Sequence, residues 1–206
     1  MPEFRALIDG YRRFRRQEYD THRRRWEHLA SRQEPPVMII ACCDSRVDPA
    51  TIFDTEPGQA FVLRNVANIV PPYEVGGGLH GASAAIEFAV LSLGVRHIVV
   101  MGHGACGGIA AALRGGDLGA KGHSFIDGWI AVLDEARDRV LAAAPPDPQS
   151  ELEREGVKTG LKNLRTFPWL AERERQGALA LHGAFFSIAE GVLHVLNEDT
   201  GEFAPA

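Results

Sequence analysis

The sequence predicts an α/β fold: a mainly parallel central β-sheet flanked by helices, with an extended N-terminal helical arm and C-terminal strands. Short apolar runs rich in β-branched residues alternate with longer helical patterns, as in parallel-sheet domains. Two of these runs end in reactive side chains, at the sheet edge where such domains bind ligands. The 206 residues, 45% of them hydrophobic, are enough for one sizeable core. We therefore expect a single domain, residues 1–206, with residues 1–32 as the arm.

The arm is rich in basic side chains between Tyr11 and Arg32, but Glu18, Asp20 and Glu27 lie among them. This mixture is typical of a solvated helix face, which could also contact a partner subunit. The formal net charge of the chain is −5, which argues against nucleic acid as the main partner.

Neither a targeting segment nor a membrane span is expected. Residues 1–16 carry charge where a secretory peptide needs an apolar run. The longest apolar stretch, residues 84–95, is interrupted by Glu87 and is too short to cross a bilayer. The chain has three cysteines, of which Cys42 and Cys43 are adjacent, so it is a poor disulfide framework and suits a reducing compartment. We expect a cytoplasmic protein without a membrane partner.

The first half of the chain alternates strands with one long helix. Apolar runs predict strands over residues 36–43, 60–68 and 95–102. Residues 79–93 are dominated by alanine and leucine without an internal proline, so they predict a mostly buried helix, which Gly94 closes. A glycine-rich turn after the third strand then opens a short helix.

The second half carries weaker signals. Residues 125–144 predict an amphipathic helix that ends at a proline-rich turn. A further helix is expected over residues 150–164, with Ser150 as its N-cap and Glu153 at capping-box spacing. Between residues 177 and 201 the pattern predicts two more strands, divided near residues 187–191.

Three side chains at two predicted strand ends suggest a metal site. Cys42 ends the first strand, and His103 and Cys106 lie three residues apart in the turn after the third. The start of the following helix should also lower the pKa of the Cys106 thiol. Two thiolates with an imidazole favour zinc, and three protein ligands leave the fourth position of a catalytic site open. The alternative is that both cysteines are small buried hydrophobic residues and His103 is a turn residue.

A carboxylate and a guanidinium follow Cys42 closely. If the chain stays extended, Asp44 and Arg46 share a face with Cys42, whereas Cys43 points the other way. Asp44 and Arg46 can form a bidentate ion pair that orients the carboxylate beside the metal. The alternative is a salt bridge that only stabilises the loop. We expect Asp48 and Asp54 to be surface or capping carboxylates.

Other histidines match no metal motif. We expect them to be ordinary core or surface residues: His97, His123, His182 and His194.

Here the motifs resemble those of a known family. The run "CCDSR" matches the Cys-x-Asp-Ser-Arg motif of β-class carbonic anhydrases, and "GHGACGG" matches their His-x-x-Cys-Gly-Gly motif. The resemblance, closest to the plant-like branch, continues through "FVLRNVANIVPP" and "AAIEFAV", and more weakly through "LKNLRTFPWL" and "LALHGAFF". It covers residues 33–183.

The resemblance implies an enzyme with one zinc ion per chain that hydrates carbon dioxide reversibly to bicarbonate and a proton, by attack of zinc-bound hydroxide. Its zinc ligands would be Cys42, His103 and Cys106, and its catalytic dyad Asp44 and Arg46. The resemblance also implies a homodimer or higher homo-oligomer with the active site at a subunit interface. The implied substrate-binding residues are Gln33, Phe61, Val66, Phe88 and Gly107.

Two departures from the family pattern carry predictions. Phe88 stands where plant-like members commonly have a tyrosine, so a hydroxyl contact is absent there. A bacterial branch holds inhibitory bicarbonate with a tryptophan, a tyrosine and an arginine; here those positions are Ile39, Phe186 and Arg64. We predict that this inhibitory site is missing.

Two other functions are compatible with the same residues. A hydrolase of carbon disulfide or carbonyl sulfide can share these motifs, because the same nucleophile attacks a similar linear substrate. A non-catalytic zinc-binding scaffold or bicarbonate-sensing module would be expected to lose a ligand or the dyad, and the sequence keeps all of them.

Overall fold

The computed structural model describes residues 1–76, 78–116 and 125–206. These residues form two compact units, Met1–Glu34 and Pro35–Ala206. Within the described ranges, no helix combines the length and the hydropathy that crossing a bilayer requires. The expected grouping of residues 1–206 into a single domain stays a prediction.

The N-terminal unit is a helical hairpin. Helix α1 (Pro2–Phe14) continues into a π-helical segment and is followed by α2 (Arg23–Ser31). The rings of Phe14 and Tyr19 both pack on Trp26, at centroid distances of 5.3 and 5.8 Å, which holds the two helices together. None of the helical residues of this unit is buried, which agrees with the expected solvated helix faces.

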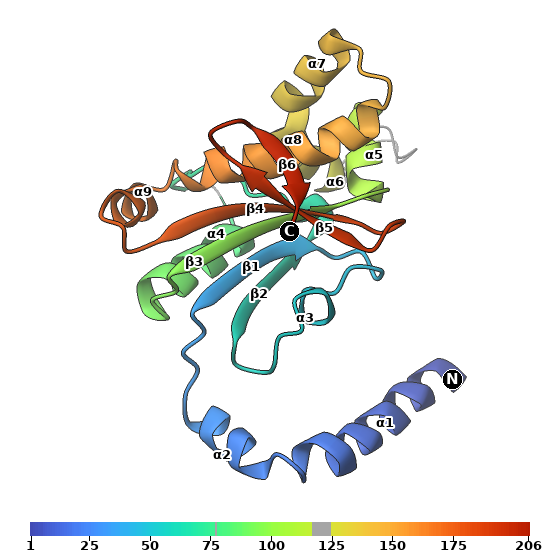
Figure 1. Ribbon diagram of the computed structural model, residues 1–206, viewed down its shortest axis with the longest axis vertical. Coiled ribbons are helices and arrows are strands. Elements are labelled where there is room, and N and C mark those ends of the chain that lie inside the picture. The colour runs from blue at the N-terminus through green and yellow to red at the C-terminus, as the bar shows by residue number, and fades with distance from the viewer. Residues whose placement is uncertain (77, 117–124) are drawn as a thin grey trace. The chain divides into compact units, whose positions relative to one another are not determined.

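The second unit is built on a sheet of six strands, counted within the described residues, in the order β2-β1-β3-β4-β5-β6 (Figure 1). The first four of these run parallel, and β5 and β6 are antiparallel to their neighbours, so the expected parallel arrangement holds for only part of the sheet. A third C-terminal strand, β6, was not expected. The strands are β1 (Val37–Cys42), β2 (Ala60–Asn65), β3 (His97–His103), β4 (Ala180–Ser187), β5 (Val192–Asn197) and β6 (Glu202–Pro205).

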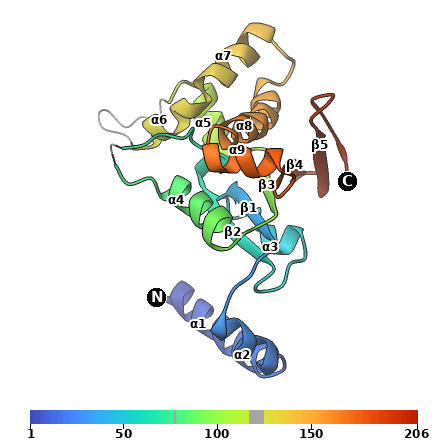
Figure 2. The same cartoon turned by 90° about the vertical axis from the view of Figure 1, so that its left-hand side faces the viewer.

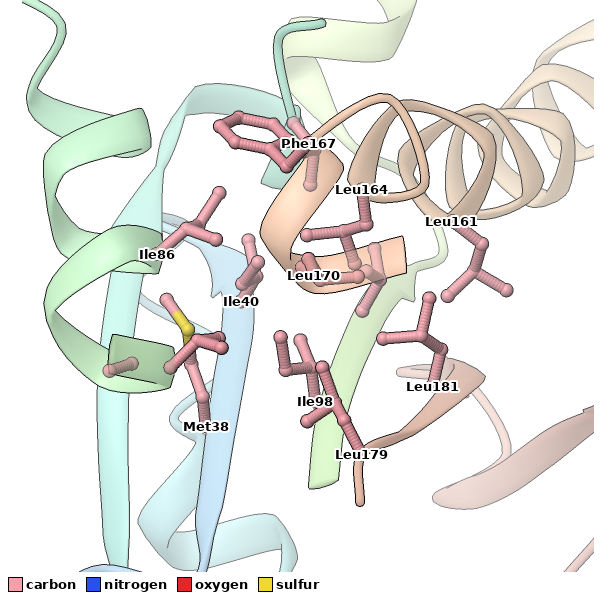
Figure 3. Close-up of a cluster of buried hydrophobic side chains, with 14 of the residues drawn as sticks. Met38, Ile40, Ile86, Ile98, Leu161, Leu164, Phe167, Leu170, Leu179 and Leu181 are labelled. Carbon is pink, nitrogen blue, oxygen red and sulfur yellow. The ribbon is translucent and has the colours of Figure 1, made fainter. Parts of the chain in front are cut away.

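Helices cover the two faces of the sheet unequally. Helices α4 (Gly81–Glu87), α8 (Pro148–Leu164) and α9 (Pro168–Arg175) lie on one face, and the short α3 (Pro49–Ile52) lies on the other (Figure 2). Between the sheet and helices α4, α8 and α9 the side chains form a closely packed core (Figure 3). Its fully buried members include Met38, Ile40, Ile86, Ile98 and Leu161. Truncating one of them to alanine should cost about 2–5 kcal/mol.

Several helices differ from the sequence expectation. The helix expected over residues 79–93 consists of α4 followed by a π-helical segment, Phe88–Ser92. The helix expected over residues 125–144 is divided into α6 (Phe125–Ile130), a 3₁₀ turn and α7 (Asp134–Ala143). The division lies at the 3₁₀ turn, Ala131–Leu133, and Gly128 is accommodated inside α6.

Helix α8 begins earlier than expected. Asp147, rather than Ser150, is its N-cap, and the Asp147 carboxylate accepts a hydrogen bond from the Ser150 N–H at 3.0 Å. Pro148 occupies the first turn, where its missing N–H costs nothing. Because the cap is at Asp147, Glu153 lies beyond the first turn and is free for another role.

Candidate metal centre

The metal centre lies where two parallel strands end. Cys42 is the last residue of β1 and His103 the last of β3, and these strands are hydrogen-bonded neighbours. Cys106 follows three residues later, as the N-cap of α5 (Gly107–Leu113). One ligand atom from each of the three side chains lies within 4.8 Å of the others, and all three residues are buried. The fold therefore brings together the three side chains that the sequence suggested as metal ligands.

The distances fit a tetrahedral zinc ion. The two sulfur atoms are 3.9 Å apart, far beyond the roughly 2.05 Å of a disulfide. Two thiolates about 2.3 Å from one tetrahedral zinc ion would be separated by about 3.8 Å. His103 Nδ1 donates to the Gly104 carbonyl at 3.0 Å, which fixes the proton on that nitrogen. The buried Nε2 of His103 has no hydrogen-bond partner among the described residues, as expected of a metal ligand.

The charges of the two thiols are coupled. The hydrogen bond with Cys106 lowers the pKa of Cys42 strongly against the effect of burial, and His103 lowers it further. The same thiol–thiol hydrogen bond, together with burial, raises the pKa of Cys106. The expected lowering by the helix start is present as hydrogen bonds from the Ile109 and Gly108 backbone N–H groups, but it is the smaller effect. Deprotonation of both thiols at this distance would therefore require a cation between them, and a zinc ion would supply it.

Asp44 and Arg46 form the bidentate pair that their spacing suggested. Arg46 Nε donates to Asp44 Oδ1 at 2.9 Å and Nη2 to Oδ2 at 2.7 Å, while the Arg46 backbone N–H also donates to Oδ1. These hydrogen bonds hold the pKa of Asp44 well below its usual range. Arg46 Nη2 also donates to the Ala105 carbonyl at 2.9 Å, so the guanidinium joins the loop after β1 to the turn that carries Cys106.

Arg64 braces the loop that carries this pair. From β2, its Nε donates to the Cys42 carbonyl at 2.9 Å, and Nη2 donates to the Asp44 and Val47 carbonyls at 2.8 and 3.0 Å. Arg64 Nη1 also forms an ion pair of 3.4 Å with Asp48, the N-cap of α3. Most of the donors of Arg64 are thus committed to main-chain carbonyls of its own chain.

Glu153 is a site residue that the sequence did not reveal. Only 3% of it is exposed, and its carboxylate accepts a hydrogen bond from the Cys106 backbone N–H at 2.9 Å and another from Gln149. Burial raises the pKa of Glu153, so the fold keeps this carboxylate buried at an electrostatic cost. Gly102 lets α8 approach β3 this closely, because a Cβ there would lie 2.8 Å from Val157 Cγ2. The sequence did not predict this role, because the spacing of Glu153 from Ser150 is that of a capping box and already accounted for the carboxylate.

The expected substrate residues are only partly gathered. The rings of Phe61 and Phe88 are 5.9 Å apart, and Phe88 is 45% exposed. Val66 lies against α5, where a Cβ on Gly108 would come within 2.8 Å of Val66 Cγ1. Gly107 is the first residue of α5, adjacent to Cys106. Gln33 belongs to the N-terminal unit and is exposed. Their roles toward a substrate stay predictions.

Other residues singled out in the sequence lie as follows. Ile39 is buried in a small cluster on the face of the sheet that α3 covers, and Phe186 is partly buried beside the cluster that contains the two zinc cysteines. His194 packs edge-on against Phe185. His123 lies outside the described residues.

Comparison with known proteins assigns the family. The carbonic anhydrase family model matches residues 37–193. The chain belongs to the β-carbonic anhydrase family. It is 38% identical to β carbonic anhydrase 5, chloroplastic, of Arabidopsis thaliana over 86% of this chain, a match that spans only 59% of the plant protein.

Solved structures support the same assignment. The β-carbonic anhydrase CcaA has a TM-score of 0.93 and 33% identity, with 100% of this chain and 93% of that chain covered. A structure described among two tetrameric β-carbonic anhydrases of Sordaria macrospora has a TM-score of 0.81 and 30% identity, with 96% and 98% covered. β-Carbonic anhydrases use zinc, and the Cys42, His103 and Cys106 set fits that ion.

Proposed function

We propose that this protein catalyses the zinc-dependent, reversible hydration of carbon dioxide to bicarbonate and a proton. One observation carries the proposal: a buried set of three zinc ligands stands beside an ordered carboxylate–guanidinium pair. A structural zinc site commonly has four protein ligands and needs no such pair, whereas a catalytic one keeps a position open. Family membership supports the same activity.

Cys42, His103 and Cys106 would hold the zinc ion, which would supply the Lewis acid that activates a water as the nucleophile. Asp44 stays ionised because Arg46 binds it, so it accepts a hydrogen bond and never donates one. The bidentate contact also fixes the direction in which the carboxylate points. Asp44 thereby orients the attacking lone pair, and Arg46 keeps Asp44 away from the metal.

Apolar side chains complete the proposed site. We assign the pocket for carbon dioxide to Phe61, Val66 and Phe88, because carbon dioxide carries no net charge or dipole and needs no polar partner. Gly107, at the first position of α5, offers a backbone N–H that can bind the bicarbonate oxygens.

We also propose that the active form is a homo-oligomer. Large apolar side chains on the second unit are exposed, among them Val62, Phe88 and Leu91 at 40–45%. The Sordaria relatives are described as tetrameric. Sedimentation analysis should therefore give a dimer or a larger assembly, and a monomer would refute this part. We further propose a cytoplasmic location, because Cys43, which is exposed and is not one of the zinc ligands, is a free thiol that suits a reducing compartment.

The test of the activity is stopped-flow carbon dioxide hydration by the zinc-loaded protein across about pH 6–9. We expect a fast rate that rises toward alkaline pH, because two thiolate ligands offset the charge of the zinc ion. Carbon disulfide and carbonyl sulfide should be poor substrates in the same preparation. A zinc-loaded protein that does not hydrate carbon dioxide would contradict the proposal, whether or not it hydrolyses the sulfur compounds.

A further inference from the structure

Two imidazoles meet at the end of β3 that is remote from the metal centre. His97 is the first residue of β3, and His182 lies on β4, where it pairs with Val99 in the parallel register. Both side chains therefore project from the same face of the sheet, on diagonally adjacent positions. His97 Nδ1 and His182 Nε2 are 3.1 Å apart, with ring centroids 5.3 Å apart. Both residues are exposed in the second unit.

The separation of these nitrogens suits chelation. Two imidazole nitrogens at about 2.0–2.1 Å from one metal ion lie about 2.8–3.4 Å apart for right-angle or tetrahedral geometry. The observed 3.1 Å falls in this range, so little movement of the strands is needed. Only one of the two facing nitrogens carries a proton in the hydrogen bond between neutral rings. Moving that proton to the far nitrogen of its own ring frees both lone pairs, without a net gain or loss of protons.

The electrostatic surroundings keep a lone pair available. Burial and the charge of His97 lower the pKa of His182, and the charge of Glu198 acts in the opposite direction with a smaller effect. Glu198 is itself paired with Arg165 at 2.7 Å. His182 is therefore neutral at neutral pH, which is the form of histidine that binds metals.

We propose that His97 and His182 form a second metal site, which takes a nitrogen-preferring divalent transition metal such as Ni²⁺, Cu²⁺ or zinc in excess. Imidazole suits these ions, whereas magnesium and calcium prefer oxygen ligands. His97 and His103 are six positions apart along β3, which corresponds to about 20 Å. The second site is thus separate from the catalytic one, and protein prepared in excess zinc would hold more than one ion per chain.

The experiment uses the full-length protein loaded with one equivalent of zinc and titrated with Ni²⁺ in a calorimeter, with zinc retention checked afterwards. We expect one additional Ni²⁺ per chain in the wild type. His97→Asn and His182→Asn should each weaken Ni²⁺ binding roughly tenfold or more, since even loss of an outer-shell partner can cost that much. His80→Asn, at another exposed histidine, is the matched control and should bind Ni²⁺ like the wild type.

Both test variants should keep their zinc and their hydration rate, which shows that they are folded. A measurement without variants adds a check: bound Ni²⁺ should broaden the imidazole NMR signals of both histidines. Absence of the extra Ni²⁺, or its displacement of zinc instead, would overturn the proposal. Weaker Ni²⁺ binding in only one of the two variants would also overturn it, because a chelate needs both histidines.

Discussion

Glu153 offers a sharp test of how the fold shapes the metal centre. Its carboxylate is the hydrogen-bond acceptor for the backbone N–H of Cys106, a proposed zinc ligand. Glu153→Ala removes this acceptor and leaves a buried N–H without it. Glu153→Gln keeps an acceptor oxygen in nearly the same position but removes the charge. The two variants therefore separate the hydrogen bond from the electrostatic contribution.

The magnitude follows from the type of contact. A hydrogen bond to a charged group contributes about 1.5–3 kcal/mol, but Glu153→Ala also removes the cost of burying a carboxylate. We expect the free energy of unfolding to fall by about 1–3 kcal/mol. Zinc affinity should fall about 10–100-fold, as is usual when a partner of a metal ligand is lost. Glu153→Gln should lower the free energy of unfolding and the zinc affinity less than Glu153→Ala does.

The assay is zinc competition against a chromophoric chelator, alongside chemical unfolding of the metal-free protein. Glu155→Gln is the matched control, because Glu155 lies on the same helix but pairs with Arg139 and Lys158 instead. If Glu153→Ala bound zinc as tightly as Glu155→Gln while being equally well folded, Glu153 would have no role in positioning Cys106 and the reasoning would fail.

Three further predictions concern the dyad, the loop and a histidine. Arg46→Ala frees Asp44, so the stopped-flow hydration rate should fall roughly a hundredfold, and an unchanged rate would refute the assigned role. Arg64 is committed to main-chain carbonyls, so rates measured at increasing bicarbonate should show ordinary product inhibition without a cooperative loss; bicarbonate bound at Arg64 in a crystal would contradict this. The folded-state pKa of His182 is lowered, so it stabilises the fold above the unfolded value of about 6.5 and this contribution is lost as pH falls toward the folded value. The free energy of unfolding, measured with denaturant at several pH values, should fall less on acidification in His182→Asn than in the wild type. The same pH dependence in both proteins would contradict the lowered pKa.

The zinc ligands could be predicted from the sequence because their chemistry is local. Cys42 ends an apolar run, and His103 and Cys106 flank one tight turn, so neighbouring parallel strands were enough to bring them together. The Asp44–Arg46 pair was also predictable, since only Ser45 separates its members. Glu153 was not, because it reaches Cys106 from a helix 47 residues further along the chain.

The fold likewise contains elements that the sequence pattern predicts and others that it does not. The buried strands are predicted by continuous apolar runs, whereas β6 (sequence "EFAP") is short and mostly exposed, so it has almost no hydrophobic pattern. The pairing of β6 with β5 is a tertiary contact, which the periodicity of the sequence does not predict. The N-cap of α8 was misplaced because Ser150 and Glu153 imitate a capping box, while Asp147 performs the capping.

The most direct test of the central claim is X-ray absorption at the zinc edge of protein loaded with one equivalent of zinc. The account predicts two sulfur ligands at about 2.3 Å and lighter atoms at about 2.0–2.1 Å, from Cys42, Cys106 and His103 and an exchangeable fourth ligand. Cys106→Ser should remove one of the sulfurs. A first shell with no sulfur, or one that Cys106→Ser leaves unchanged, would contradict the assignment of this centre.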